Sequence, residues 1–347
     1  MPTTLADIAA ALGVSKMTVS RAIRNHPSVN PETRERVLEM ARRMNYRPNQ
    51  HARALATNRS YLIGFIAPDL MHSYFAEIAK AVEAVVRPAG YEILICNTEE
   101  DAEKEIAEVE ALRHRTDGLI IASALPPQRV KEYRRWIREG TKIVLIDRRF
   151  QNLKCTAVIT DDVRVGSMAT EHLIALGHRR IGHLRGPAVS TAEERFLGYR
   201  QALAKHRIRF DEKLVRACGF FEDQGYEAMR AWIEEGDLPS AIFATNDPVA
   251  IGAMRALEEA GIRVPDDISL VGAGDIRYAD LLRVPLTTVS WARTEMGRQA
   301  AQLLIEMFED GVGLKQREVR VEPRLIVRQS CAPFDPKRSR VALRSAD

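Results

Sequence analysis

The 347 residues are 46% hydrophobic and 28% charged, which predicts a soluble globular protein with room for a small domain and a larger domain of two lobes. No apolar stretch approaches the roughly 18 residues that span a bilayer, and no charged segment followed by an apolar core opens the chain, so we expect neither membrane insertion nor secretion. The four cysteines lack paired spacing, which favours a reducing cytoplasm and no metal site.

The positive charge is concentrated at the N-terminus. Residues 1–60 contain ten Lys and Arg against four Asp and Glu, a net charge of +6, whereas the whole chain has 51 against 47. Residues 61–347 therefore have 41 against 43, a net charge of −2. A basic head on a nearly neutral body predicts that the head alone binds a polyanion. The alternative is a basic helical bundle whose charges are only solvated.

Residues 4–25 predict two short helices that cross tightly. Thr4 followed by Asp7 three residues later is a helix-capping signature, and Gly13, which tolerates the left-handed turn conformation, ends the first helix. Ser15 caps the second helix, whose residues supply hydrogen-bond donors and long side chains rather than apolar side chains for a core. This is the spacing of a helix-turn-helix, which places its second helix in the major groove of DNA.

A third helix follows, with Asn30 as its cap and Pro31 at its first helical position. Residues 49–57 then predict a hinge, which Asn49 caps and in which Leu55 is the only large apolar residue. The hinge is far shorter than the roughly 12 to 15 residues that make an isolated helix stable, so we expect it to be helical only when something holds it. The alternative is an ordinary linker.

From residue 61 short apolar runs alternate with amphipathic helices, a pattern typical of parallel sheets with covering helices. Strands are expected at 61–67, 91–96, 118–122, 142–146 and 156–160 in one lobe, and at 180–184, 214–219, 241–246 and 268–272 in the other. The segment 287–291 and the terminal REVRVEPRLIVRQS are expected to cross back between the lobes, with a helix at 293–309 between them. Two doubly wound lobes place the carboxyl ends of their strands around one cleft, where small ligands bind.

The predicted fold is therefore α/β, with a three-helix helix-turn-helix head and a hinge helix before a two-lobed, doubly wound core. We expect a DNA-binding domain over residues 1–48, a hinge over 49–60, and an effector-binding and dimerisation domain over 61–331. Residues 332–347 show no sustained pattern, which predicts a disordered tail.

From Thr4 to Ser330 the chain resembles the lac repressor and purine repressor (LacI/GalR) family of bacterial transcription regulators. The motifs that carry the resemblance are GVSKMTVSRAIRN with NYRPN in the head, ARALAT in the hinge, and PDLMHSYFAEI, DGLIIAS, GHRRIGHL, ATNDPVAIGAMRAL, GIRVPDDISLVG and PLTTV in the core. The resemblance implies a periplasmic-binding-protein-like core and a homodimer whose two heads bind one palindromic operator in double-stranded DNA. It also implies a small polar effector, a sugar, sugar acid or related metabolite, in the interlobe cleft, and it calls for no cofactor. Pairing of dimers into tetramers, and the direction of the effector's action, stay open.

In the recognition helix the resemblance places Lys16, Met17 and Arg21 at base edges, where arginine can bind guanine with two hydrogen bonds. The residues that match phosphate contacts, which fix register but read no sequence, are Thr18, Ser20, Asn25, Asn30, Thr33, Tyr46 and Asn49. Leu55 aligns with the family's minor-groove wedge, and Ala52 is small enough to let two hinge helices pack closely.

The residues that match the family's effector contacts all lie at predicted strand exits: Tyr74, Phe75, Ser123, Asp147, Asp161, Arg195, Phe221, Asn246 and Asp275. The arginine is the central one, because a guanidinium group suits a carboxylate, a ring edge or a pair of hydroxyls. For the three aromatic residues, packing in the core is the alternative.

One departure from the family's pattern concerns the end of the last strand. The family commonly has an aromatic residue followed by two acids, whereas this chain has Ala273 and Gly274 before Asp275. Direct hydroxyl binding at Gly274 is therefore lost, so either Asp275 compensates or the effector is larger or more acidic than a neutral sugar. Arg148 and Arg149 favour an acidic effector; the alternative places both arginines at the surface.

Two rival interpretations are an enzyme with two α/β lobes and an exported binding protein of the transport type. GAG at 272–274 lacks the third glycine of a dinucleotide loop, and neither GxxxxGK[ST] nor G-x-S-x-G occurs. A DNA-binding head stands where an exported protein has a signal peptide. The sequence therefore predicts a cytoplasmic transcription regulator, a repressor rather than an enzyme.

Overall fold

The computed structural model describes residues 3–23, 25–46, 54–55, 57–71, 73–309 and 316–336. The chain divides into two compact units, Met1–Ser60 and Tyr61–Asp347. No helix within the described ranges is both long and apolar enough to cross a membrane.

Over residues 3–46, apart from position 24, the first unit contains α1 (Leu5–Leu12), α2 (Lys16–Ile23) and α3 (Pro31–Arg43). The predicted cap of α1 is present, since Thr4 N donates to the Asp7 carboxylate at 2.7 Å and Asp7 N donates to Thr4 Oγ1 at 3.3 Å. Gly13 ends α1 with a φ of 65°, in the left-handed region that glycine adopts at no steric cost. The three helices share a small core centred on Ile8, Val19 and Val37, all fully buried. The predicted helix-turn-helix head is thus confirmed.

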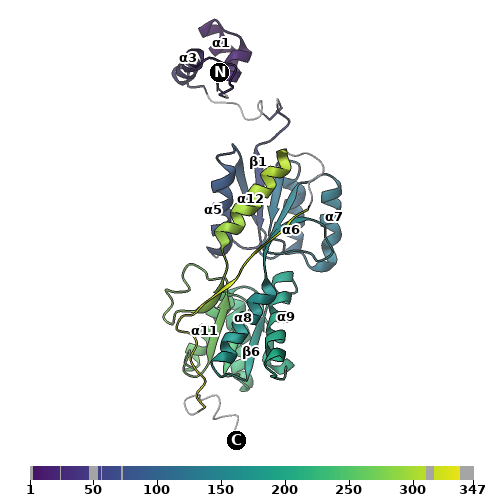
Figure 1. Cartoon of the computed structure of the whole chain (residues 1–347), viewed down its shortest axis with the longest axis vertical. Coiled ribbons are helices and arrows are strands. Elements are labelled where there is room, and N and C mark those ends of the chain that lie inside the picture. Colours follow the sequence, from purple (N-terminus) through teal and green to yellow (C-terminus); the bar gives the residue numbers. More distant parts are fainter. Residues whose placement is uncertain are drawn as a thin grey trace. The chain divides into compact units, whose positions relative to one another are not determined.

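The second unit begins with a lobe that we call the N-lobe, whose sheet has the strand order β11-β5-β4-β3-β1-β2 (Figure 1). Its strands, all parallel, are β1 (Leu62–Ala67), β2 (Glu92–Asn97), β3 (Gly118–Ile121), β4 (Ile143–Ile146), β5 (Thr156–Thr160) and β11 (Glu318–Val321). One face packs against α5 (Ser73–Val86) and α12 (Arg293–Glu309), the other against α6 (Ala102–Leu112) and α7 (Val130–Arg138), which follows a 3-10 turn at Pro127–Arg129.

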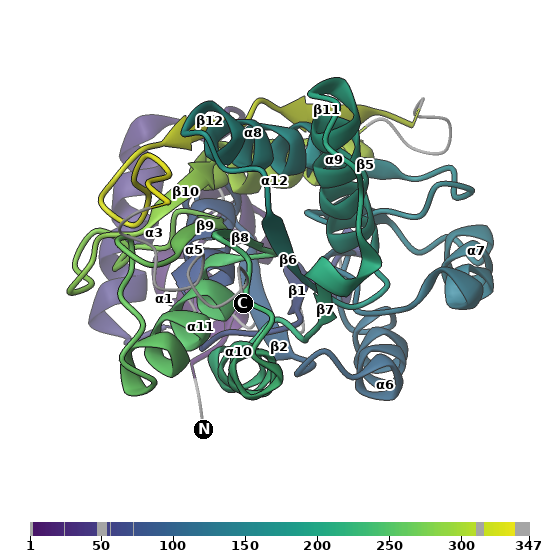
Figure 2. The same cartoon turned by 90° about the horizontal axis from the view of Figure 1, so that it is seen from below.

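The C-lobe sheet has the order β12-β10-β9-β8-β6-β7. Its strands are β6 (Ile181–Arg185), β7 (Val215–Ala217), which follows a 3-10 turn at Glu212–Leu214, β8 (Ala241–Ala244), β9 (Ser269–Ala273), β10 (Thr287–Ser290) and β12 (Arg324–Ile326). Only the pairing of β12 with β10 is antiparallel. Figure 2 shows α8 (Asp162–Ala175) and α9 (Ser190–Lys205) on one face of this sheet, and α10 (Glu222–Glu235) and α11 (Asp247–Glu259) on the other.

The chain crosses between the lobes three times. It passes from β5 to α8, from β10 to α12, and from β11 to β12. The expectation for the terminal segment is confirmed, because β11 joins the N-lobe sheet and β12 joins the C-lobe sheet. The segment 287–291 differs from the expectation, since β10 is a paired strand of the C-lobe and the crossing follows it. In each lobe the carboxyl ends of the parallel strands face the other lobe, which is where a ligand site forms in such sheets.

Candidate DNA-binding surface and effector site

The recognition helix α2 presents a polar face. Lys16 and Arg21 are exposed and Met17 is 60% exposed, whereas Val19 and Ala22 turn into the core of the first unit. Ser15 Oγ accepts a hydrogen bond from Thr18 N at 3.0 Å, as the predicted cap requires. The side chains predicted to read bases therefore do not pack in the core of the first unit.

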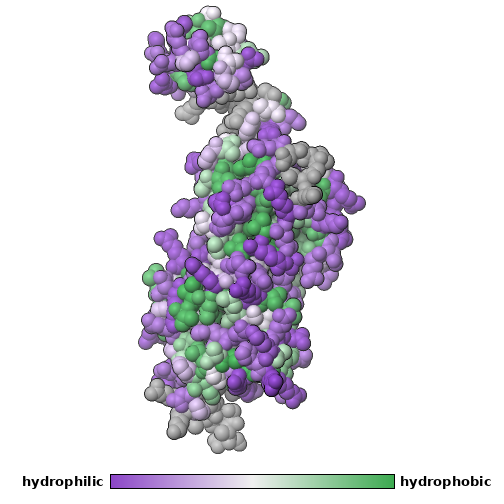
Figure 3. Space-filling model, in the orientation of Figure 1, coloured by the Kyte–Doolittle hydropathy of each residue, from purple (hydrophilic) through white to green (hydrophobic). Residues whose placement is uncertain are grey.

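The predicted phosphate contacts sit around this helix. Thr18, Ser20, Thr33 and Tyr46 are half-buried, and Asn25 and Asn30 are exposed. Asn30 caps α3, since its Oδ1 accepts from Thr33 N at 2.7 Å, which leaves the amide NH₂ group for an external acceptor. Figure 3 shows hydrophilic residues over most of the visible surface of this unit.

The hinge residues are described only in part. Asn49 and Ala52 lie outside the described residues. Leu55 is described and is 88% exposed, so its side chain contributes almost nothing to the protein's own cores.

A cavity of about 70 Å³ lies between the N-lobe and the C-lobe. Six of the nine predicted effector contacts line it: Tyr74, Phe75, Asp147, Arg195, Phe221 and Asn246. The same cavity is also lined by Asp69, Glu100, Arg148, Phe220 and Trp291. Residues from strand ends and helix starts of both lobes thus surround one space.

Three predicted contacts are not brought to the cavity, and each is engaged elsewhere. The Ser123 hydroxyl donates to Glu105 Oε1 at 2.8 Å in the interior of the N-lobe. Asp161 caps α8, its Oδ1 accepting from Arg164 N at 3.0 Å. Asp275 accepts from Arg328 Nη2 at 2.6 Å. These three residues therefore stay predictions without support from the cavity, because strand-end position alone does not fix where a side chain points.

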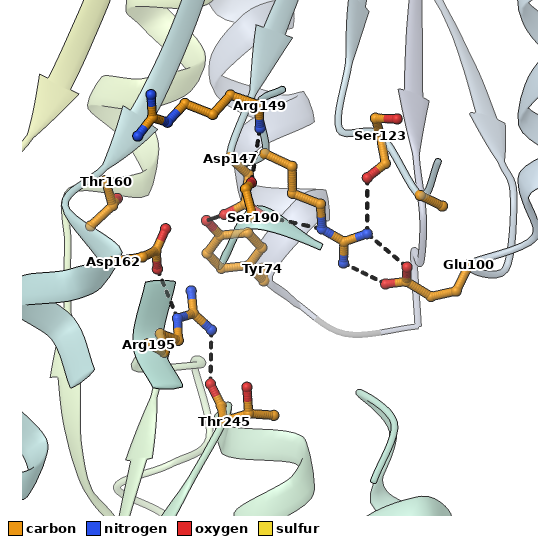
Figure 4. A network of polar contacts seen from close by, with 12 residues as sticks. Tyr74, Glu100, Ser123, Asp147, Arg149, Thr160, Asp162, Ser190, Arg195 and Thr245 are labelled. Carbon is orange, nitrogen blue, oxygen red and sulfur yellow. Dashed lines mark hydrogen bonds and ion pairs between the residues drawn. The ribbon is translucent and has the colours of Figure 1, made fainter. Parts of the chain in front are cut away.

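Arg195 is held in place by Asp162 and Thr245 of the C-lobe (Figure 4) and by the indole ring of Trp291. Its Nε donates to Asp162 Oδ1 at 2.7 Å and its Nη1 donates to the Thr245 carbonyl at 2.8 Å. The guanidinium carbon lies 5.1 Å from the centre of the Trp291 ring. Nη2 has no hydrogen-bond partner among the described residues, so this donor is available to a ligand in the cavity.

The acid that binds Arg195 is Asp162, which follows the predicted Asp161 in the sequence. Burial raises the pKa of the Asp162 carboxyl to about 7, against the lowering effect of Arg195. For Arg195 burial also disfavours the charge, but Asp162 and Asp147 keep its pKa above the ordinary value. The arginine therefore stays charged, and burial makes the Asp162 carboxyl easier to protonate than an aspartate in water.

Close packing of α8 against α9 brings this pair together. A Cβ atom on Gly166 would lie 2.0 Å from the Arg195 carbonyl oxygen, and one on Gly198 would lie 2.0 Å from the Val163 carbonyl oxygen. Neither approach is possible for any residue other than glycine. Because α8 starts with Asp162, the glycine contacts set the distance between the acid and the arginine.

On the opposite side of the cavity, Asp147 is oriented by a chain of two hydrogen bonds. Trp291 Nε1 donates to the Tyr74 hydroxyl at 2.9 Å, and that hydroxyl donates to Asp147 Oδ1 at 2.5 Å. Burial, together with the Asp147 charge, raises the pKa of Tyr74 well above its ordinary value, so the phenol remains a donor. Asp147 has a φ of 66°, in the left-handed region that aspartate enters more readily than most residues other than glycine.

The alternative that places Arg148 and Arg149 at the surface is wrong for Arg148, which is buried, whereas Arg149 is partly exposed. Arg148 is 5% exposed and binds Glu100 with two hydrogen bonds, from Nη2 at 2.5 Å and Nη1 at 2.7 Å. Arg149 bonds Glu194 at 2.9 Å and lies 3.3 Å from a Glu318 carboxylate oxygen. The argument that these arginines favour an acidic effector therefore fails, since carboxylates of the chain already neutralise both.

Sequence reasoning missed Glu100, Asp162, Phe220 and Trp291. The doubled acid that follows β5 was a signal for Asp162, because a cap residue and its successor point in different directions. For Glu100, Phe220 and Trp291 the only signal in the sequence was a position just after a strand, and many surface residues have such a position.

Comparison with known proteins gives the family. Residues 4–49 match the family model described as Bacterial regulatory proteins, lacI family, and residues 170–331 match the Periplasmic binding protein-like domain. The chain is 34% identical to the HTH-type transcriptional regulator DegA of Bacillus subtilis over 338 residues, 96% of this chain and 100% of that protein. It is also 34% identical to the HTH-type transcriptional repressor PurR of Haemophilus influenzae (strain PittEE) over 333 residues, 94% of this chain and 98% of that protein.

Among solved structures, the lac repressor dimer bound to operator and the anti-inducer ONPF matches with a TM-score of 0.84 and 28% identity, covering 96% of this chain and 100% of that one. The transcriptional regulator CelR in complex with cellobiose matches with a TM-score of 0.70 and 28% identity, covering 94% and 99%. The helix-turn-helix head and the two-lobed α/β core agree with these relatives. The chain belongs to the lacI family of bacterial regulatory proteins, transcriptional regulators that join a DNA-binding domain to an effector-binding core.

Proposed function

We propose that this protein is a cytoplasmic repressor, and not an enzyme, that binds a palindromic operator as a homodimer under the control of a small polyhydroxylated effector in the interlobe cavity. The observation that carries the proposal is the pairing of an oriented carboxylate, Asp147, with the available Nη2 of Arg195 across a cavity walled by aromatic rings. Acceptors and donors on opposite walls, with apolar ring faces between them, suit a molecule that has several hydroxyls on a compact skeleton.

The relatives support both halves of the proposal. A lac repressor structure contains operator and ONPF, a CelR structure contains cellobiose, and a family regulator of Enterococcus faecium, similar with a TM-score of 0.69 at 27% identity, contains ribose. One head offers few base-reading side chains, and a symmetric dimer doubles them on a symmetric site.

A ligand screen on the full-length protein tests the effector assignment. Neutral sugars, sugar acids and nucleobases are added and the thermal unfolding midpoint is recorded. A ligand at about 100 times its dissociation constant stabilises the folded state by roughly 2.7 kcal/mol, so a true effector should raise the midpoint by several degrees. The same ligand should also change operator affinity. A stabilising polyol that leaves operator affinity unchanged, or a panel in which only nucleobases bind, contradicts the assignment.

On the DNA side, Arg21→Ala should weaken operator binding by about 1 to 3 kcal/mol and relax the preference at one base pair. The operator is first selected from random DNA, and the variant is then compared on that site and on random sequence. Arg36→Ala, which removes an equal charge from an exposed position on α3, is the control and should affect both DNAs alike. Equal losses on operator and random DNA for Arg21→Ala would refute its base-reading role.

A further inference from the structure

The second arginine of the cavity, Arg148, is bound in a way that differs from Arg195. Both of its terminal nitrogens donate to the Glu100 carboxylate, and Nη1 also donates to the Ser123 carbonyl at 3.1 Å. The side chains of Arg148 and Glu100 are only 6% and 18% exposed. From the C-lobe, the Phe220 ring stacks on the guanidinium at 4.8 Å. Arg148 and Glu100 together therefore form an ordered part of the cavity wall. Figure 4 shows Glu100 in the network of polar contacts.

The charges of the cavity are unequal. Three carboxylates line it, Asp69, Glu100 and Asp147, against two guanidinium groups, Arg148 and Arg195. Each arginine already has a partner acid, Glu100 for Arg148 and Asp162 for Arg195. Arg195 keeps one donor, Nη2, without a partner among the described residues, whereas both terminal nitrogens of Arg148 already bind Glu100.

For an anion to bind the terminal nitrogens of Arg148, it has to displace Glu100 from a two-point contact. The remaining donor, Nε, makes no hydrogen bond but is buried. The displaced carboxylate then stays in the cavity wall near Asp147, whose Oδ2 lies 3.7 Å from Arg148 Nε. Leaving one buried carboxylate without its counter-ion costs more than the new contact returns, because both anions compete for the same guanidinium donors. A neutral hydroxyl avoids this exchange, since it can donate to the unused lone pairs of Glu100 and Asp147.

We infer that Glu100 is a specificity-determining residue that acts as a charge filter: by occupying Arg148 it makes the effector site reject anionic ligands and accept uncharged ones. The inference deepens the proposed function and rests on it, because it takes this cavity as the effector site. A substitution that removes the charge of Glu100 but keeps the shape of its side chain should convert this part of the cavity wall into an anion site.

The test uses inorganic phosphate as the probe and Glu100→Gln as the variant of the full-length protein. Titration calorimetry at constant ionic strength measures phosphate binding, with chloride as the background anion. Wild type should show no saturable binding at millimolar phosphate, whereas Glu100→Gln should gain affinity by at least about tenfold through the freed guanidinium. Glu100→Gln/Arg148→Gln should lose that gain.

Two variants serve as matched controls. Glu194→Gln removes a carboxylate of similar burial from the neighbouring Arg149 and changes the net charge equally, yet Glu194 does not line this cavity, so it should gain no phosphate binding. Glu100→Asp keeps the charge on a shorter side chain and should exclude phosphate as wild type does.

Saturable phosphate binding by wild type overturns the inference without any variant, and so does an equal gain in Glu194→Gln. If Glu100→Gln does not fold, the thermal unfolding midpoint of the wild-type protein is measured with two matched pairs of ligands, glucose with glucuronate and galactose with galacturonate. In a pair that contains a ligand of this protein, we expect the neutral sugar to stabilise the wild-type protein and the uronate not to. Tighter binding of a uronate overturns the inference. The phosphate result involves neither effector nor operator, so it stays distinguishable from failure of the proposed function, which a ligand screen without hits would indicate.

Discussion

Replacement of Leu55 by alanine is expected to weaken operator binding by about 2 to 3 kcal/mol, the scale of opening one base step, while binding to random DNA changes little. The physical reason is the position of this leucine. It is 88% exposed and supports no core of the protein, so its apolar surface is available to enter the minor groove. Alanine is too short to keep a base step open, and the bend in the operator should decrease with the loss of affinity.

The measurement compares operator and random DNA by fluorescence anisotropy, and bending by the gel mobility of permuted fragments. Leu197→Ala, an equal truncation at an exposed leucine of α9, is the control and should leave all three quantities unchanged. A Leu55→Ala protein with wild-type affinity and bending would show that the segment is a plain linker.

Arg195→Ala is expected to abolish the response to the effector. The substitution removes a charged donor whose hydrogen bonds to a ligand contribute about 1.5 to 3 kcal/mol, so the dissociation constant should rise by at least about tenfold. Operator binding without effector should remain. Titration calorimetry and operator binding with increasing ligand measure the two effects, and unchanged effector affinity in the variant refutes the site.

The same substitution has a cost in stability that depends on pH. It leaves the Asp162 carboxyl buried without a counter-ion, which destabilises by about 3 to 5 kcal/mol when the group is ionised. In wild type the pKa of Asp162 is already raised to about 7, so its folded form binds a proton more readily than the unfolded chain, and its contribution to stability falls as pH rises from about 4 to 7. Without Arg195 the fall should continue above pH 7, and the loss relative to wild type should be larger at pH 8 than at pH 6. Arg195→Ala/Asp162→Asn removes the buried charge and should abolish this difference while the effector response stays lost.

The fold was predictable from sequence because its signals are local. The capping pair Thr4 and Asp7, the turn at Gly13 and the cap at Asn30 each depend on residues within a few positions, and the structure contains all of them. The buried strands of parallel sheets are continuous apolar runs, such as Leu62–Ala67, which are visible without knowledge of their partners.

The site was predictable only in outline, since strand exits converge but side-chain directions do not follow from position. Asp161 and Asp162 are neighbours, yet one caps α8 at the surface and the other binds Arg195 in the interior. Arg148 pairs with Glu100 across 48 positions of sequence, and that pairing removes the reason that Arg148 alone gave for expecting an acidic effector. Such partners depend on the packing of the whole lobe.

The central claim, that a symmetric dimer reads a specific DNA sequence, is tested most directly by selection of binding sites from random double-stranded DNA with the full-length protein. The selection is run once without ligand and once with a pool of neutral sugars. The two arms allow for an effector that releases the protein from DNA and for one that strengthens DNA binding. We expect enrichment of one palindromic sequence with two half-sites in at least one arm, and loss of that enrichment with Arg21→Ala. Enrichment of a single half-site, or of no sequence in either arm, would contradict it.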